Sequence, residues 1–475
     1  MDGNEKSCDE QNQKELTKGV SLLIGDPKKA ILKLSGPMIV AMMFLAAYNL
    51  VNAVWVSGLG SDALAAVGFV SPIFMVVVGL SNGLGAGVSS SISRKIGARD
   101  KSGADNITVH AMLIMIIVSV ILTLVLLYFL EPMLVVMGAG AALDLAVEYG
   151  NIVFAGSILI VFTNTAYAIL GGEGDTKRTM YAMGAGSLIN AILDPILIYW
   201  AGLGIAGAAW GTIISLFLVS AVQIYWLLIK KDTYVSLTWK AFAPSMDVMK
   251  DILQVGIPAS LEFLLYSIDA IIINSMLVRV SGTDAVAVYT VGWRVIMVAI
   301  IPLIAIATAE ISVAGAAFGA RRYENLEIIH NYSTKLGFII GAATAIITGV
   351  LAPQITTLFT YTSQSAHLAP TMISFMHVMC LFYPSMSPGI MSVSLFQGAG
   401  KGLTALFLNM LRDVILITMM AFILGIVLGL GQEGIWWGIV FGSIIGDLFS
   451  FLWAKLYISR LIKDKGISGE KRAAS

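Results

Sequence analysis

Charged residues are scarce in this chain. Asp, Glu, Lys and Arg make up 12% of its 475 residues and hydrophobic residues 57%, against about 25% and roughly 45–50% in soluble globular proteins. This composition excludes an ordinary soluble fold and predicts a polytopic membrane protein that is surrounded by the lipid bilayer. The formal net charge is zero, and we expect no nucleic-acid partner.

Cysteine is rare as well. Cys8 lies in a polar N-terminal stretch and Cys380 in an apolar segment, so they offer no plausible pair and no disulfide framework is expected. The first 27 residues are polar and contain no apolar core of a signal sequence. We therefore expect no cleavable signal peptide, and we expect the first apolar segment to direct membrane insertion.

Motifs for nucleotide hydrolysis and for catalysis are also missing. The chain has no Gly-x-x-x-x-Gly-Lys-Ser/Thr sequence, which argues against ATP-driven transport by this chain alone. Gly202-x-Gly204-x-x-Gly207 matches a dinucleotide fingerprint, but it falls between apolar segments rather than after a strand. Because no catalytic or metal-ligand constellation is present either, we expect neither an enzyme nor a bound cofactor.

Long apolar runs are abundant. A membrane-spanning helix needs about 20 predominantly apolar residues, and twelve stretches reach that length. They lie near 34–57, 63–92, 107–130, 145–170, 179–200, 206–229, 251–278, 285–316, 334–351, 370–397, 403–428 and 434–457. The prediction is an all-α polytopic membrane protein with twelve transmembrane helices.

Lysine and arginine are sorted between the connections of these segments. They cluster at both ends of the chain and in every second connection, and they are nearly absent from the others, where Arg279 is the exception. The positive-inside rule then predicts a multi-pass protein of the cell membrane with both termini in the cytoplasm. The clustered residues include Lys28, Lys29, Lys33, Arg94, Lys95, Arg99, Lys101, Lys177, Arg178, Lys230, Lys231, Arg321, Arg322, Lys455 and Arg460.

The chain also repeats itself at a spacing of about 222 residues. The matched pairs include Gly60-Ser61-Asp62-Ala63 with Gly282-Thr283-Asp284-Ala285, and Gly97-Ala98-Arg99 with Gly319-Ala320-Arg321. Two six-helix bundles are therefore predicted, related by a pseudo-two-fold axis along the membrane normal and meeting at a cavity. We expect a cytoplasmic tail over 1–27, an N-lobe over 28–230, a cytoplasmic linker over 231–250, a C-lobe over 251–460 and a tail over 461–475.

One carboxylate inside an apolar segment is the strongest functional signal. Asp194 lies in the segment 179–200, Asn190 lies one helical turn earlier on the same face, and Pro195 follows and frees nearby backbone carbonyls. An ionisable residue at membrane depth is costly, so it marks a functional site by default. These residues predict a cation or proton site.

Several motifs resemble one transporter family. They are Leu170-Gly171-Gly172-Glu173-Gly174-Asp175-Thr176-Lys177, Gln397-Gly398-x-Gly400-Lys401, Asn190-x-x-x-Asp194-Pro195 and, near the first helix, Tyr48-Asn49-Leu50 and Trp55-Val56-Ser57-Gly58-Leu59-Gly60. Over roughly residues 19–460 the chain resembles exporters of the MATE (multidrug and toxic compound extrusion) family, in the DinF-like archaeal and bacterial branch. The resemblance implies a MATE/MOP-type fold whose lobes rock between V-shaped states.

The resemblance also implies a function and a site. Such proteins are secondary active antiporters that expel amphipathic, often cationic compounds while H⁺ or Na⁺ enters. In DinF-like relatives the coupling site consists of a first-helix Asp, an Asn and an Asp one turn apart in the fifth helix, and a Thr in the sixth. The last three match Asn190, Asp194 and Thr212, but Asn52 stands at the first position.

Helix geometry brings these four residues to similar depths in the membrane. Asp194 and Thr212 each lie about six residues from the connection 201–205, which is roughly 9 Å at 1.5 Å per residue. Asn52 lies about five residues from the same outer surface, and Asn190 one turn deeper. Oxygen ligands suit Na⁺ and a buried carboxylate suits a proton, so both ions stay open. Because Asn52 is neutral, the site holds at most one negative charge.

The second half has apolar-segment acids of its own. Glu262 and Asp269 are seven residues apart and share a helix face. They could replace the missing first-helix acid, form a second proton site, bind the positive charge of a substrate, or pair with Arg294. Arg412 and Asp413 are neighbours, so a local charge pair is expected there. Further buried charges in this half are Glu310 and Asp447.

Two other functions are alternatives to ion-coupled export. A flippase for lipid-linked phosphate compounds would need a basic cavity, whereas embedded acids outnumber embedded arginines here. A membrane enzyme or a receptor would need a catalytic cluster or a sizeable soluble domain, and the sequence has neither. We expect small amphipathic or cationic substrates and a monomeric protein.

Overall fold

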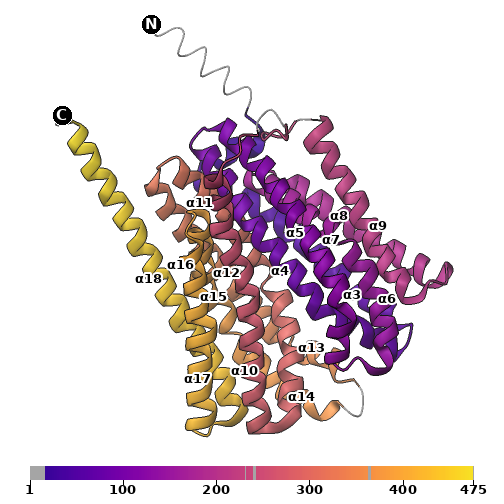
Figure 1. Ribbon diagram of the computed structural model, residues 1–475. Helices are drawn as coiled ribbons and strands as arrows, with labels where there is room; N and C mark the ends of the chain where they lie inside the picture. Colours follow the sequence, from indigo (N-terminus) through magenta and orange to yellow (C-terminus); the bar gives the residue numbers. More distant parts are fainter. Residues whose placement is uncertain (1–15, 231, 239–241, 362–364, 474–475) are drawn as a thin grey trace.

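The computed structural model describes residues 16–230, 232–238, 242–361 and 365–473, and the side chains among them up to residue 465. Within these ranges all regular structure is helical (Figure 1). The predicted all-α class is therefore confirmed.

The helices of the first half run back and forth across the molecule. Aspartates cap several of them, since Asp26, Asp100 and Asp175 accept hydrogen bonds from backbone N–H groups that have no partner within the helix. The elements are α2 (Lys18–Leu23), α3 (Pro27–Ser57), α4 (Ser61–Gly97), α5 (Lys101–Val136), α6 (Leu143–Ala155), α7 (Ser157–Gly172), α8 (Thr176–Pro195) with its π-helical extension η2 (Ile196–Trp200), and α9 (Gly204–Ile224) with η3 (Tyr225–Lys230).

The second half repeats this order with more breaks. Its elements are α10 (Met246–Ala299), α11 (Ile301–Gly319), α12 (Tyr323–Val350), α13 (Ala352–Phe359), α14 (Ala369–Met379), α15 (Phe382–Gly398), α16 (Gly402–Asn409), η6 (Met410–Ile417), α17 (Thr418–Phe422), η7 (Ile423–Val427) and α18 (Gly431–Ala473). The π-helical stretches within the eleventh predicted segment widen the helix locally.

The number of membrane spans agrees with the prediction. Ten helices among the described residues are long and apolar enough to cross a membrane, and two bent pairs raise the number to twelve. The bends are 47° between α6 and α7 and 46° in the pair formed by 366–379 and 382–398. The long helix α10 breaks at Gly282, with φ 74° and ψ −162°, between the predicted seventh and eighth segments.

The two halves share an unusual turn. Arg99 and Arg321 both adopt positive φ, 58° and 55°, a conformation that is uncommon for residues other than glycine. In each turn the following residue donates a backbone hydrogen bond of 2.9 Å, from Asp100 to Lys95 and from Arg322 to Ala317. The same strained geometry at equivalent positions supports the internal repeat.

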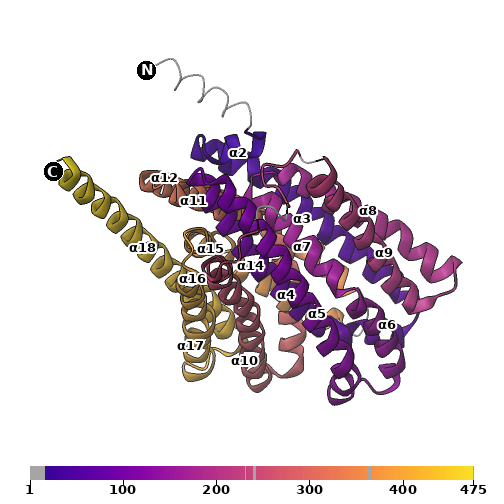
Figure 2. The same cartoon turned by 45° about the horizontal axis from the view of Figure 1, so that its top comes forward.

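The halves pack together mainly at one end of the molecule. Helix α2 and the end of α18 lie at this end, which we call the terminal end, and the opposite end is the far end (Figures 1 and 2). At the terminal end the apolar cores mix both halves, since Ile31 and Leu34 pack with Val313 and Ile329. In the cores of the far end, one cluster contains only residues of the first half and another only residues of the second.

A stripe of glycines on α4 makes this contact close. Gly79, Gly83 and Gly87 recur every four residues, and a methyl group added to any of them would collide with α10, at Phe263, Ser260 or the backbone near Ile252. Small residues at this spacing let two membrane helices approach closely. The glycine stripe therefore sets the distance between the two halves.

Replacing one glycine of the stripe tests this arrangement. Gly87→Ala would place a methyl group against the backbone of α10, and such overpacking costs about 1–3 kcal/mol. We expect a lower midpoint of thermal unfolding in detergent. Gly36→Ala is the matched control, because Gly36 lies inside α3 with no atom near its added methyl group; an equal loss in both variants would contradict the close packing.

The connection between the halves is anchored to the first half. The N–H group of Val235 donates to the Glu173 carboxylate at 3.1 Å, and that of Ser236 donates to Asp105 at 2.7 Å. Asn106 exchanges two hydrogen bonds of 3.1 Å with the backbone of Ala243. Glu173 follows α7 at the terminal end and is almost completely buried. Its burial raises the pKa of the Glu173 carboxyl from 4.5 to about 8.

This raised pKa predicts how stability changes with pH. The folded protein holds the Glu173 proton more tightly than the unfolded chain does, so the free energy of unfolding should fall as the pH rises from about 4.5 to about 8. Glu173→Gln should flatten this dependence in thermal unfolding measured across that range. Glu131→Gln, at an exposed acid on α5, should leave it unchanged, and an unaltered pH profile in Glu173→Gln would contradict the assignment.

Candidate functional site

Asp194 is the second-last residue of α8, two residues before η2 begins. Its side chain is completely buried, and neither carboxylate oxygen has a hydrogen-bond partner among the described residues. Gly211 on α9 makes room for one of these oxygens, since a methyl group there would collide with it. A buried ionised carboxylate without donors costs several kcal/mol, so this position calls for a proton or a cation.

Helix α3 presents polar groups to the same place. The Asn52 amide donates to the Tyr48 hydroxyl at 2.9 Å. That hydroxyl also interacts with the Thr212 side chain and lies within electrostatic range of Asp194. The Thr212 hydroxyl donates to the backbone of Ala208 at 3.1 Å, so its oxygen remains available as an acceptor.

Asn190 contributes one turn deeper on α8. Its amide group donates to the Ser215 hydroxyl at 3.1 Å, and Ser215 donates to the Thr212 carbonyl at 2.8 Å. The side-chain oxygens of Asn190 and Asn52 accept no hydrogen bond among the described residues. Together with Asp194 they form a group of oxygen atoms that lack donors.

The geometry therefore brings Asp194, Asn190, Thr212 and Asn52 to neighbouring positions on α3, α8 and α9. Sequence reasoning missed Tyr48, which links Asn52 to Thr212, and Tyr149 on α6, which is near enough to Asp194 to sense its charge. Tyr48 lies one turn before Asn52 on the same helix face. This spacing is the sequence feature that points to Tyr48 as a neighbour of the site.

The donor set fits a proton or a hard monovalent cation. One carboxylate and several neutral oxygens are ligands of the kind that Na⁺ accepts, and a protonated carboxyl could donate to one of the neighbouring oxygens. No group of three His, Cys, Asp or Glu side chains able to hold a metal ion occurs in the described part of the chain.

The acids of the second half have different surroundings. Glu262 accepts a hydrogen bond of 3.0 Å from the Gln397 amide. Asp269 is 9% exposed, and one of its carboxylate oxygens has no partner among the described residues. Arg294 makes no ion pair with either acid within the described ranges. Asp269 is therefore the less satisfied of the two.

Arg412 binds the two acids beside it. Its guanidinium binds both carboxylate oxygens of Asp413, at 2.7 and 3.1 Å, and reaches Asp447 at 3.2 Å. Ser443 donates to the second oxygen of Asp447 at 2.6 Å. The expected local charge pair is confirmed, and it is part of a larger buried network in which one guanidinium contacts two carboxyl groups.

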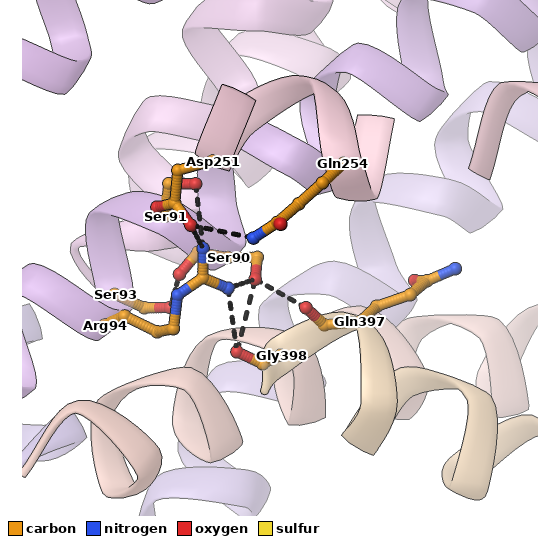
Figure 3. Close-up of polar contacts among 8 residues, drawn as sticks. All are labelled: Ser90, Ser91, Ser93, Arg94, Asp251, Gln254, Gln397 and Gly398. Atoms are coloured by element: carbon orange, nitrogen blue, oxygen red, sulfur yellow. Dashed lines mark hydrogen bonds and ion pairs between the residues drawn. The ribbon is translucent and has the colours of Figure 1, made fainter. Parts of the chain in front are cut away.

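A polar contact joins the two halves at the terminal end (Figure 3). Arg94 on α4 donates to Asp251 on α10 at 2.8 Å and to the Gly398 carbonyl, after which α15 ends, at 3.3 Å. Ser90 donates to the carbonyls of Gln397 and Gly398. Nearby, the hydroxyl groups of Ser89 and Ser312 are 3.0 Å apart.

Gln397 connects this contact with the interior of the second half. Its carbonyl accepts from Ser90 in the first half, and its side-chain amide donates to Glu262. A change in the charge of Glu262 would therefore alter the hydrogen bond from Gln397, whose carbonyl accepts from Ser90 across the interface.

Comparison with known families identifies this architecture. The MatE family model matches residues 37–196 and 258–429, one stretch in each half. The chain belongs to the MATE family. Its arrangement of membrane helices around two halves is that of a MATE transporter rather than an enzyme.

Related proteins agree over nearly the full length. The chain is 26% identical over 439 residues to the multidrug export protein MepA of Staphylococcus aureus, covering 92% of this chain and 95% of MepA. It is 25% identical over 439 residues to MepA of Staphylococcus saprophyticus, with coverage of 92% and 95%.

Solved MATE structures superpose closely. A MATE protein in complex with MaL6 is 43% identical, with a TM-score of 0.91 and coverage of 94% of this chain and 100% of that one. A MOP superfamily transporter from Pyrococcus furiosus, described as having a binding pocket of reverse polarity that suggests a different function, is 43% identical with a TM-score of 0.92 and coverage of 94% and 99%. An outward-facing multidrug resistance MATE transporter is 43% identical with a TM-score of 0.91 and the same coverage.

The Arg94 contact is expected to keep the terminal end closed, so breaking it should expose residues that lie between the two halves. Removing its charge with Arg94→Gln breaks an ion pair whose side chains are 11% and 33% exposed, a loss of about 1 kcal/mol. We expect a cysteine at position 312, introduced after both native cysteines are replaced, to react about fivefold faster with a maleimide in this variant.

Lys95→Gln is the matched control for this experiment. Lys95 neighbours Arg94 but pairs with Asp100 inside the first half, and both of those side chains are well exposed. The control should leave the labelling rate unchanged. Equal rates in wild type and Arg94→Gln would show that the ion pair does not hold the halves together.

Proposed function

We propose that this protein is a secondary active efflux transporter of the cell membrane that exports amphipathic, often cationic compounds by antiport with H⁺ or Na⁺. The family supports a transporter, and the name of the related MepA proteins supports multidrug export. In this proposal the two halves alternate between a state open to the outside and a state open to the cytoplasm.

The observation that carries the proposal is the unmatched carboxylate of Asp194. It is buried and lacks hydrogen-bond donors, and the side-chain oxygens of Asn190, one turn away, and of Asn52 lack donors as well. A buried carboxyl group is more stable with a bound proton or cation than as an unpaired negative charge. Binding of H⁺ or Na⁺ from outside, and its release to the cytoplasm, would drive export.

The other embedded acids support a cationic cargo. Asp269 has a carboxylate oxygen without a partner, and Glu262 is bonded by the neutral amides of Gln397 and Asn409. Arg412 is engaged with Asp413 and Asp447. The unmatched charge in the second half is therefore negative, which suits a positively charged substrate and disfavours the phosphate-bearing cargo of a flippase.

The proposal includes an orientation. Basic residues gather at the terminal end, so this end would face the cytoplasm. The packing of the halves at the terminal end then corresponds to a state that is closed to the cytoplasm, in keeping with the likeness to an outward-facing relative. A single chain contains both lobes, and we propose that a monomer is sufficient.

Transport in liposomes tests the function. The purified protein is reconstituted, a proton gradient or a sodium gradient is imposed separately, and the movement of a fluorescent cationic dye is followed. We expect one of the two gradients to drive dye transport. Absence of transport under both gradients would overturn the antiport proposal.

Asp194→Asn tests the site. The amide keeps the shape of the side chain but cannot ionise, so we expect gradient-driven transport to fall at least tenfold while the protein remains folded. Asp144→Asn, at an exposed acid of α6 near the far end, should transport like wild type. Normal transport by Asp194→Asn would show that coupling occurs elsewhere.

Asn52→Asp tests whether the site holds one charge. A second carboxylate next to Tyr48 should allow a second cation to bind, so the ratio of ion flux to dye flux should rise toward twice the wild-type value. An unchanged ratio in a variant that still transports would mean that position 52 does not take part in ion binding.

A further inference from the structure

A second buried ionisable pair lies in the other half of the protein, away from Asp194. Glu310 on α11 and His330 on α12 are both completely buried, and the His330 Nδ1 atom lies 3.5 Å from a carboxylate oxygen of Glu310. Among the described residues, the two Glu310 carboxylate oxygens and the His330 Nδ1 atom have no hydrogen bond of good geometry. The facing polar atoms of both side chains are thus left without a proper hydrogen-bond partner between the two helices.

Four helices enclose this pair. On α12 Ser333 is the nearest polar neighbour of Glu310, and on α15 the Ser392 hydroxyl is 3.5 Å from His330 Nε2. On α18 the ring of Phe451 stacks on His330 with centroids 5.1 Å apart. The nearest charge beyond the pair is that of Lys455 on α18, which is itself bonded to Glu327 at the surface.

The surroundings decide how much charge the pair can carry. A lone carboxylate or a lone imidazolium at complete burial would cost several kcal/mol. Lys455 lies outside the pair and is already matched by Glu327. The low-energy state is therefore one shared proton, with Glu310 neutral or with both groups ionised as a pair.

The internal repeat shows that packing does not require these residues. At the offset that relates Gly97 to Gly319, the positions equivalent to Glu310 and His330 are Val88 and Thr108. Both are completely buried in the first half. Because the same helix pair packs there around an apolar and a hydroxyl side chain, the charged pair has a reason other than filling space.

A route from the terminal end leads toward the pair. A cavity of about 40 Å³, large enough for water, lies between the start of α3 and the helices α11 and α12. Its lining includes Val313, one turn from Glu310, and Ile329, which precedes His330. Arg99 and Arg322 lie at the same cavity and are the charged groups that would face an arriving proton.

We propose that Glu310 and His330 form a second proton-binding site, which holds one proton while the terminal end is closed and exchanges it with water through this cavity. The site stands apart from Asp194 and does not depend on the proposed function. The proton moves between the Glu310 carboxylate and His330 Nδ1 without any other bond being broken.

Infrared and NMR spectroscopy of the full-length protein in lipid test this inference. Measurements are made in the Asp194→Asn background, so that the site of the first half does not contribute. The infrared difference between this background and the same protein with Glu310→Gln reports whether Glu310 is protonated, and ¹⁵N-histidine spectra report whether His330 is protonated. Glu324→Gln, at an exposed acid of α12 that pairs with Lys465, is the control.

We expect one proton on the pair at neutral pH, on either partner, and its loss as the pH is raised. The Glu324→Gln protein should behave in the same way. A carboxylate beside a neutral imidazole, or a carboxylic acid beside an imidazolium, would overturn the proposal. So would a proton that stays in place at every pH, or one that Na⁺ displaces at constant pH, which would indicate a sodium site.

A variant that copies the first half separates proton binding from folding. Glu310→Val with His330→Thr places the residues of positions 88 and 108 in the equivalent helix pair, so it should unfold at the wild-type temperature or higher. The proton signal of the pair should be lost completely. Retention of that signal in the folded double variant would assign the proton to another group and overturn the proposal.

Discussion

A charge that leaves water for an apolar interior must be neutralised there, because neither solvent nor salt can screen it. The acids of this chain meet that requirement in different ways. Arg412 is shared by Asp413 and Asp447 in fixed ion pairs, whereas Glu262 receives a hydrogen bond from a neutral amide. For Asp194 the described residues supply no donor at all. The fixed networks hold helices in place, and the unmatched acid is where a mobile ion can bind and leave.

The contact between the halves is of a different kind. It rests on glycines of α4 that bring two backbones close together, and on a small set of hydrogen bonds around Arg94 and Ser90. At the far end the apolar cores are already separate. The far-end cores can therefore part without repacking, whereas the core shared at the terminal end must separate for that end to open.

Much of this could be predicted from residues alone. Apolar run length predicts the twelve spans, and equal distances from the connection 201–205 place Asp194 and Thr212 at one depth on neighbouring helices. The roles of these residues remain predictions. The Tyr48 link was missed because a tyrosine near the end of a membrane helix is common and its partner lies on another helix. The break of α10 at Gly282 falls between the predicted seventh and eighth segments, whereas the bend between α6 and α7 lies inside the predicted fourth segment and was not expected.

Two other features were visible but were not interpreted. Gly79, Gly83 and Gly87 have the spacing of a helix contact, yet the spacing does not say which helix lies opposite. Glu310 was recognised as a buried acid without a partner. Its partner follows from the turn at Arg321, since Glu310 and His330 lie at similar distances on either side of that turn, on antiparallel helices.

The amide at position 52 has an electrical consequence. In the proposed mechanism, a site with one carboxylate admits one monovalent cation, so exchange for a monovalent cationic compound transfers no net charge across the bilayer. Membrane voltage, worth about 2.3 kcal/mol per charge at roughly 100 mV, then adds nothing to the export of such a compound. For an uncharged compound the same cycle carries one charge inward, and voltage drives it. The charge of the cargo thus decides whether an energised membrane assists this protein.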